Sequence, residues 1–152
     1  MPKRHSTILG LLAICVLLQA CATTSMPGQE TTIDRLDQAN HAFEKANFGE
    51  AERHYAEITK QAPQLALPHF RLGLIAYRRD DLQQASDHFQ TLLKHDSNHA
   101  PGIHNLAVIH LEQARRLFNR YEQLAPEAAS SPRIINVRRA IEAMKDEPGT
   151  QE

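Results

Sequence analysis

Apolar residues between Thr32 and Asp146 recur three and four positions apart, which is the spacing of an α-helix that buries one face. Residues that break or turn a helix interrupt this pattern and divide it into segments of about three to four turns. These breakers are Gly49, Pro63, Pro68, Asp80-Asp81, Pro101, Pro126 and Pro132. Only 5% of the residues are aromatic and tryptophan is absent, which favours helices over sheets. The pattern predicts an all-α domain over residues 32–145, followed by a frayed acidic tail at 146–152.

An alanine followed four positions later by an aromatic residue occurs three times in this region. The three pairs are Ala51 and Tyr55, Ala85 and Phe89, and Ala114 and Phe118; the second pair lies 34 positions after the first. A small residue lets two helix backbones approach, and an aromatic ring one turn later fills the gap above it. Proline or serine follows each alanine after twelve positions and ends the helix. The motif predicts antiparallel helix pairs that stack on their neighbours.

This pattern resembles the tetratricopeptide repeat, which has the form W-x2-L-G-x2-Y…A-x3-F…P and a period of about 34 residues. The second unit carries most of the pattern: His69 at the Trp position, Leu72, Gly73, Ala76, Ala85, Phe89 and Ser97. The first unit, Thr32 to Leu65, matches best in its second helix, with Ala51, Tyr55 and Pro63. The resemblance implies a short right-handed α-solenoid: two regular repeats, a degenerate third and a C-terminal capping helix.

The third unit departs from the pattern. Its small residue Ala107 precedes the motif alanine Ala114 by only seven positions, against twelve in the second unit. The five missing residues are those of the turn between the helices. The apolar spacing therefore predicts one uninterrupted helix from about Gly102 to Leu124. The alternative is two shortened helices with a tight turn near residues 110–113.

A last helix is predicted to begin at Ser131-Pro132. Its apolar residues would cover the open end of the stack, because solenoids need such a cap. These residues are Ile134, Ile135, Val137, Ala140, Ile141 and Met144.

Residues 1–20 have the pattern of a signal peptide. Lys3 and Arg4 precede an apolar run from Ile8 to Leu18, which is about half of the ~20 residues that a membrane-spanning helix needs. Leu18-Gln19-Ala20-Cys21 then resembles the lipobox of bacterial lipoproteins, in which the chain is cut before the cysteine. The alternative is an ordinary secretory signal that is cut nearby, with Cys21 incidental.

The lipobox resemblance implies that Cys21 carries the acyl chains of a permanent membrane anchor. Ala22 stands where an aspartate would retain such a lipoprotein, so the resemblance implies the outer membrane, with the protein facing the periplasm. Residues 21–31 are then the lipidated cysteine and a flexible tether, since they contain Pro27, Gly28 and several Ser and Thr but no apolar period.

Charge and motifs exclude several classes of function. Without Lys3 and Arg4, 15 basic residues face 18 acidic ones, so no nucleic-acid partner is expected. The lipobox resemblance implies that Cys15 leaves with the signal peptide and that Cys21 is lipidated, so the domain would have neither a thiol nor a disulfide. There is no Gly-x-Ser-x-Gly elbow and no glycine-rich phosphate loop. We therefore expect no enzymatic activity and no cofactor.

Histidine is the one excess in the composition, with nine residues. His95, His99 and His104 are the best candidates for a weak Zn or Cu site, but a metal site needs ligands that converge. We expect solvated histidines and helix caps instead, and no metal. The alternative function is a metal- or haem-delivery accessory that uses these surface histidines.

In tetratricopeptide folds the first helices line a concave groove that binds a peptide or a partner helix. Carried over by register, the groove consists of Leu36, Asn40, Phe43, Glu44, Phe70, Arg71, Leu74, Tyr77, Arg78, His104, Asn105 and Val108. For Leu36, Leu74 and Val108 the alternative is that their side chains pack in the core and do not line the groove. The resemblance implies a protein partner for a non-enzymatic adaptor or scaffold in envelope or appendage assembly. So short a groove makes a homo-oligomer possible.

Overall fold

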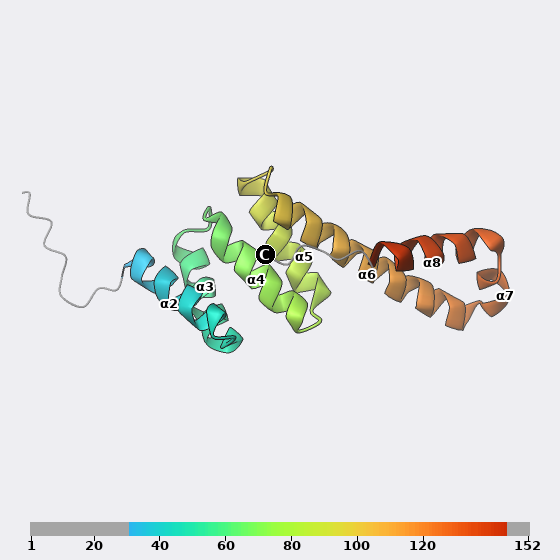
Figure 1. Cartoon of the computed structure of the whole chain (residues 1–152), viewed down its shortest axis with the longest axis horizontal. Coiled ribbons are helices and arrows are strands. Elements are labelled where there is room, and N and C mark those ends of the chain that lie inside the picture. Colours follow the sequence, from blue (N-terminus) through green and yellow to red (C-terminus); the bar gives the residue numbers. More distant parts are fainter. Residues whose placement is uncertain (1–30, 146–152) are drawn as a thin grey trace, which may run out of the picture. The chain divides into compact units, whose positions relative to one another are not determined.

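The computed structural model describes residues 31–145, which form seven helices and no strand. They are α2 (Thr32–Glu44), α3 (Phe48–Gln61), α4 (Ala66–Arg78), α5 (Leu82–His95), α6 (Ala100–Leu124), α7 (Pro126–Ala129) and α8 (Pro132–Lys145) (Figure 1). The expected all-α class is confirmed. The expected signal peptide, the lipidation at Cys21, residues 22–30 of the tether and the acidic tail lie outside the described residues.

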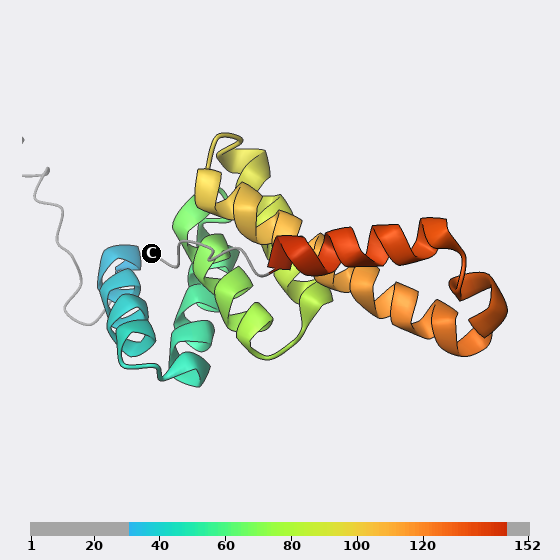
Figure 2. The same cartoon turned by 45° about the vertical axis from the view of Figure 1, so that its right-hand side comes forward.

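Each helix packs against its successor along the first part of the domain: α2 on α3, α3 on α4, α4 on α5 and α5 on α6 (Figures 1 and 2). The helix starts have the predicted period, because α2, α4 and α6 begin at Thr32, Ala66 and Ala100, in equal steps of 34 positions. The second helices, α3 and α5, begin at Phe48 and Leu82, which are separated by the same step. The repeated sequence motif therefore corresponds to a repeated helix arrangement.

Two apolar clusters fill the spaces between these helices. The first contains Ala39, Ala42, Ala51, Tyr55, Ile58, Leu72 and Ile75. The second contains Phe70, Ala76, Leu82, Ala85, Phe89, Leu92 and Ile109. Both clusters contain a motif alanine with its aromatic partner, and all four of these residues have no exposed surface. The sequence motif thus marks the core positions.

Small residues allow the close approach that the motif predicts. A Cβ atom added to Gly73 of α4 would lie 2.8 Å from Cζ of Phe89 in α5. One added to Gly102 at the start of α6 would lie 2.5 Å from Cδ2 of Leu92. Neither site has room for a side chain, so these two glycines set the distances between α4 and α5 and between α5 and α6.

The two turns within the helix pairs are alike. Ala46 has φ 56° in the turn after α2, and Asp80, at the equivalent position of the next unit, has φ 64° in the turn after α4. Next to it, Asp81 caps α5 by accepting the backbone N–H of Gln84 at 3.0 Å. The acidic pair at residues 80–81 therefore lies at the turn where it was expected.

The third unit contains one helix, α6, of 25 residues. The prediction of an uninterrupted helix is confirmed, and the alternative of two helices with a turn near residues 110–113 is wrong. The first part of α6 packs on α5 and its later part packs on α8 (Figures 1 and 2). Its length is about 37 Å at 1.5 Å per residue.

The last helix begins at Pro132, as predicted, and packs on the later part of α6. Of its six predicted apolar residues only Ile141 is buried; Val137 and Met144 are 40% and 51% exposed. The hairpin of α6 and α8 therefore keeps part of its apolar surface open. Within residues 31–145 no helix has the length and apolar character to cross a bilayer.

Candidate partner-binding face

The predicted groove residues come from the first helices α2, α4 and α6, and three of them meet around one ring. The guanidinium group of Arg71 lies 4.5 Å from the ring centre of Phe43. That of Arg78 lies 5.5 Å from the same ring centre. A cation over an aromatic face is attracted by about 0.5–2 kcal/mol. We call Phe43, Phe48, Arg71 and Arg78 the arginine–phenylalanine face.

Phe48 belongs to this face although it was not among the predicted residues. It opens α3, its ring centre lies 5.5 Å from that of Phe43 in an edge-on contact, and Arg78 lies 5.1 Å above it. The sequence contained a usable sign: an aromatic residue follows directly on the Ala46-Asn47 turn, where the second helix returns along the first. The predicted groove contained residues of the first helix of each unit only, and Phe48 belongs to a second helix.

The two arginines have no carboxylate partner among the described residues. The Nε atom of Arg71 is buried and makes no hydrogen bond in this part of the chain, but the Arg71 side chain does form a hydrogen bond with Tyr55. Arg78 donates one long hydrogen bond, 3.5 Å, to the carbonyl oxygen of Leu74. Arg79 differs, since it forms an ion pair with Glu52 at 2.5 Å. The arginine–phenylalanine face therefore contains two guanidinium groups that lie over rings and form no ion pair with a carboxylate of the described residues.

Asn40 has a structural partner beside this face. The hydroxyl of Tyr55 donates a hydrogen bond to its side-chain oxygen at 2.7 Å. Burial raises the pKa of Tyr55 to about 12, although the nearby charge of Arg71 opposes the shift. Tyr55 is therefore a neutral donor, and Asn40 has its amide NH₂ left to donate.

The other predicted groove residues differ in their surroundings. Phe70 is only 8% exposed and belongs to the second core cluster, where its ring centre lies 4.9 Å from that of His99. Leu36 packs against the first cluster and Leu74 against the second. Glu44, Tyr77 and His104 are exposed, and Asn105 and Val108 are half-buried. Phe70 is thus a core residue. Leu36 and Leu74 contact the core, which was the alternative role considered for them.

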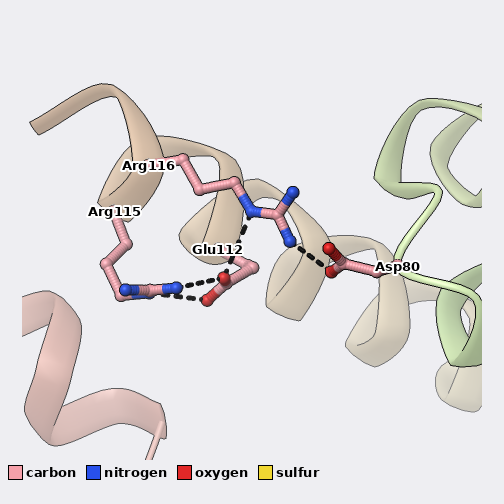
Figure 3. A network of polar contacts seen from close by, with 4 residues as sticks. All are labelled: Asp80, Glu112, Arg115 and Arg116. Carbon is pink, nitrogen blue, oxygen red and sulfur yellow. Dashed lines mark hydrogen bonds and ion pairs between the residues drawn. The ribbon is translucent and has the colours of Figure 1, made fainter. Parts of the chain in front are cut away.

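A network of ion pairs joins the turn after α4 to the middle of α6 (Figure 3). Arg116 reaches from α6 to the carboxylate of Asp80 and also donates to Glu112 at 3.3 Å. Glu112 in turn accepts from Arg115 at 2.8 and 2.5 Å. These hydrogen bonds raise the pKa of both guanidinium groups. The network connects the second unit to the long helix, a role that the sequence did not indicate.

The three histidines that were the candidates for a weak metal site have different surroundings. His99 caps α6, because its Nδ1 accepts the N–H of Gly102 at 3.0 Å. His95 stacks on the buried ring of His69 at 6.4 Å. His104 is exposed. Within residues 31–145 no three His, Cys, Asp or Glu side chains are placed to hold a metal ion.

His69 lies between α4 and α5, stacked on His95 and 5.9 Å from the ring centre of His88. Its Nε2 lies 3.0 Å from the carbonyl oxygen of Pro63, which can only accept, so Nε2 carries the proton. Burial lowers the pKa of His69 and of His88, and each is lowered further by a neighbouring histidine.

An apolar groove of about 350 Å³ lies between α6 and α8. It is lined by Ala114, Leu117, Phe118, Tyr121 and Ile134. None of these residues was predicted to form a binding surface, although the sequence did place apolar residues along the whole of α6.

Neither a family model nor a curated protein sequence matches this chain.

Proposed function

We propose that this chain is a lipid-anchored adaptor of the tetratricopeptide type, which binds a protein partner and catalyses no reaction. The support for the repeat type is the regular spacing of the helix starts, together with the buried pairs of a small and an aromatic residue between paired helices. The support for the anchor is the sequence around Cys21. The location that follows is the periplasmic side of the outer membrane, in the assembly of the envelope or of an appendage.

The arginine–phenylalanine face is the observation that carries the binding function. Its two guanidinium groups lie over aromatic rings, and the described residues offer them no carboxylate. Planar guanidinium groups bind carboxylates through paired hydrogen bonds, and the half-buried rings of Phe43 and Phe48, which pack against the first core cluster, leave part of their surface for an apolar side chain. The partner we infer is therefore a peptide or helix that presents an acidic side chain next to an apolar one.

The test replaces both arginines with glutamine, as Arg71→Gln with Arg78→Gln. A photo-crosslinking residue at position 77, on the exposed side of α4, captures the partner in intact membranes. The control variant is Arg53→Gln with Arg133→Gln, which removes two exposed arginines from other helices. We expect at least a tenfold loss of the crosslinked species in the first variant and full yield in the control.

Circular dichroism and thermal unfolding show whether both variants remain folded. Equal yields from two folded variants would refute the assignment of this face.

A further inference from the structure

A stripe of residues along α6 faces away from the core. Its members alternate four and three positions apart: Ile103, Ala107, His110, Ala114, Leu117, Tyr121 and Leu124. Ile103, Leu117 and Leu124 are 49%, 68% and 76% exposed. A repeat of about 3.5 residues keeps one face of a helix against a partner helix, as in a coiled coil. We call these seven residues the α6 stripe.

The corresponding face of each earlier unit is covered by that unit's own second helix. The residue 34 positions before Ala107 is Gly73, which lies against Phe89 of α5. The residue 34 positions earlier again is Ala39, which is buried in one cluster with Tyr55 of α3. In the third unit no second helix returns, because α6 continues to Leu124. Ala107 is consequently exposed.

The sequence shows why α6 does not fold back. Residues 73–77 and 83–85 align with 107–111 and 112–114, with Ile75 over Ile109 and Ala85 over Ala114. The segment without a counterpart is Arg-Arg-Asp-Asp-Leu, residues 78–82, which contains the turn between α4 and α5. A connection too short to turn back favours the exchange of an element between two copies of a chain.

We propose that two copies of this chain pair antiparallel along the α6 stripe, so that the later half of each α6 serves as the second helix of the other copy's third unit. The stripe is complementary to itself when Ala114 lies on the two-fold axis. Tyr121 of one copy then lies over Ala107 of the other, and Leu124 over Ile103. The pair of Tyr121 and Ala107 places an aromatic ring against a small residue, as the internal pair of Phe89 and Gly73 does, although by position the counterpart of Phe89 in α6 is Phe118.

The size of the surface fits such a dimer. The groove between α6 and α8, lined in part by Leu117, Phe118 and Ile134, receives the first half of the other copy's α6. From Ile103 to Leu124 the stripe is about 32 Å long. Two helices in contact over that length, with α8 alongside, remove roughly 600–800 Å² from each copy, which is close to the standard size of a specific interface.

Cysteine crosslinking of the full-length protein in its membrane tests the pairing. Residues 31–145 contain no cysteine, so an introduced cysteine provides the single thiol in this part of the chain. Ala114→Cys places two thiols together at the two-fold axis. Asn119→Cys is the matched control, because it lies on the same helix about 140° around from position 114. We expect oxidation to link Ala114→Cys into dimers at least tenfold more than Asn119→Cys.

Leu117→Glu in the Ala114→Cys background provides a second measurement. Leu117 is 68% exposed, so this change leaves the fold intact but places two carboxylates in the dimer interface. We expect a tenfold loss of the linked dimer with unchanged circular dichroism. A monomeric Ala114→Cys protein, equal linkage of Asn119→Cys, or linkage of position 114 to a different protein would overturn the proposal. The arginine–phenylalanine face lies elsewhere and is tested separately.

Discussion

Gly49 and Gly73 both lie in helices, but their surroundings are opposite. A Cβ atom on Gly49 would meet nothing within 4 Å, whereas one on Gly73 would lie 2.8–3.0 Å from three atoms of the Phe89 ring. That ring is fully buried. At position 49, therefore, glycine only costs helix stability, whereas at position 73 it also allows two helices to pack closely.

Gly49→Ala and Gly73→Ala are expected to change stability in opposite directions. At position 49 alanine lowers the entropy of the unfolded chain, so the free energy of unfolding rises by about 0.5–1 kcal/mol. At position 73 the same gain is exceeded by overpacking, which costs about 1–3 kcal/mol. Urea unfolding of both variants measures the two signs. A stabilised Gly73→Ala protein would show that α4 and α5 separate easily.

His69 and His88 make stability depend on pH. Burial lowers the pKa of both groups in the folded chain, so the unfolded chain binds their protons first as pH falls. Their contribution is complete above about pH 6.5 and is lost as pH falls from there toward their folded pKa values. We expect the melting temperature to drop as the pH is lowered from about 6.5.

The double variant His69→Gln with His88→Gln should flatten this dependence on pH. The exposed His41 serves as the control, and His41→Gln should keep the slope of the unaltered protein. If the double variant keeps that slope as well, other groups cause the loss of stability in acid.

Among the elements, α6 differs most from the repeat, and the difference comes from missing residues. Its first part continues the stack on α5, and its later part forms a separate hairpin with α8. Glu112, Arg115 and Arg116 form ion pairs at the junction of these two parts, and Arg116 also binds Asp80 (Figure 3). Ion pairs near the surface, such as these, stabilise little, so helix continuity depends mainly on the uninterrupted sequence.

Restoring the missing turn should change the assembly. Inserting Arg-Arg-Asp-Asp-Leu between Leu111 and Glu112 supplies the connection that the second unit has. We expect the later half of α6 to fold back on Ala107 and cover the α6 stripe within one chain. Light scattering after size-exclusion chromatography would then give a monomer where the unaltered protein gives a dimer. An insertion of Ala-Ala-Ala-Ala-Ala is the control, since it lengthens the helix without providing a turn.

In the molecule as a whole, stability of the described domain comes from stacking. Each of the two core clusters draws residues from more than one helix pair: Leu72 and Ile75 of α4 complete the first, and Ile109 of α6 completes the second. No pair buries its apolar face alone, which is the behaviour of repeat proteins. The first unit thus depends on the second and the second on the third, so the first part of α6 is structural.

The proposed membrane anchor can be tested on the whole protein. Cys21→Ser should remove the acyl chains and leave the precursor uncut before residue 21, so that the mature protein is lost from the membrane fraction. Cys15→Ser, within the predicted signal peptide, should leave both cleavage and lipidation intact. Intact-mass measurement distinguishes the two outcomes. An unmodified mature N-terminus in the unaltered protein would contradict the anchor.

The helical class, the repeat period and the core positions followed from sequence alone, because helix periodicity and small–aromatic spacing are local properties of the chain. The single long helix was equally predictable, since nothing between Ile103 and Leu124 breaks a helix. Which groove residues are free depended instead on tertiary packing. Phe70 lies in the core and Phe48 lies beside the arginines, because the register within a helix does not fix the rotation of that helix against its neighbours. The exposure of the α6 stripe also arises from packing, since it depends on a second helix that does not return.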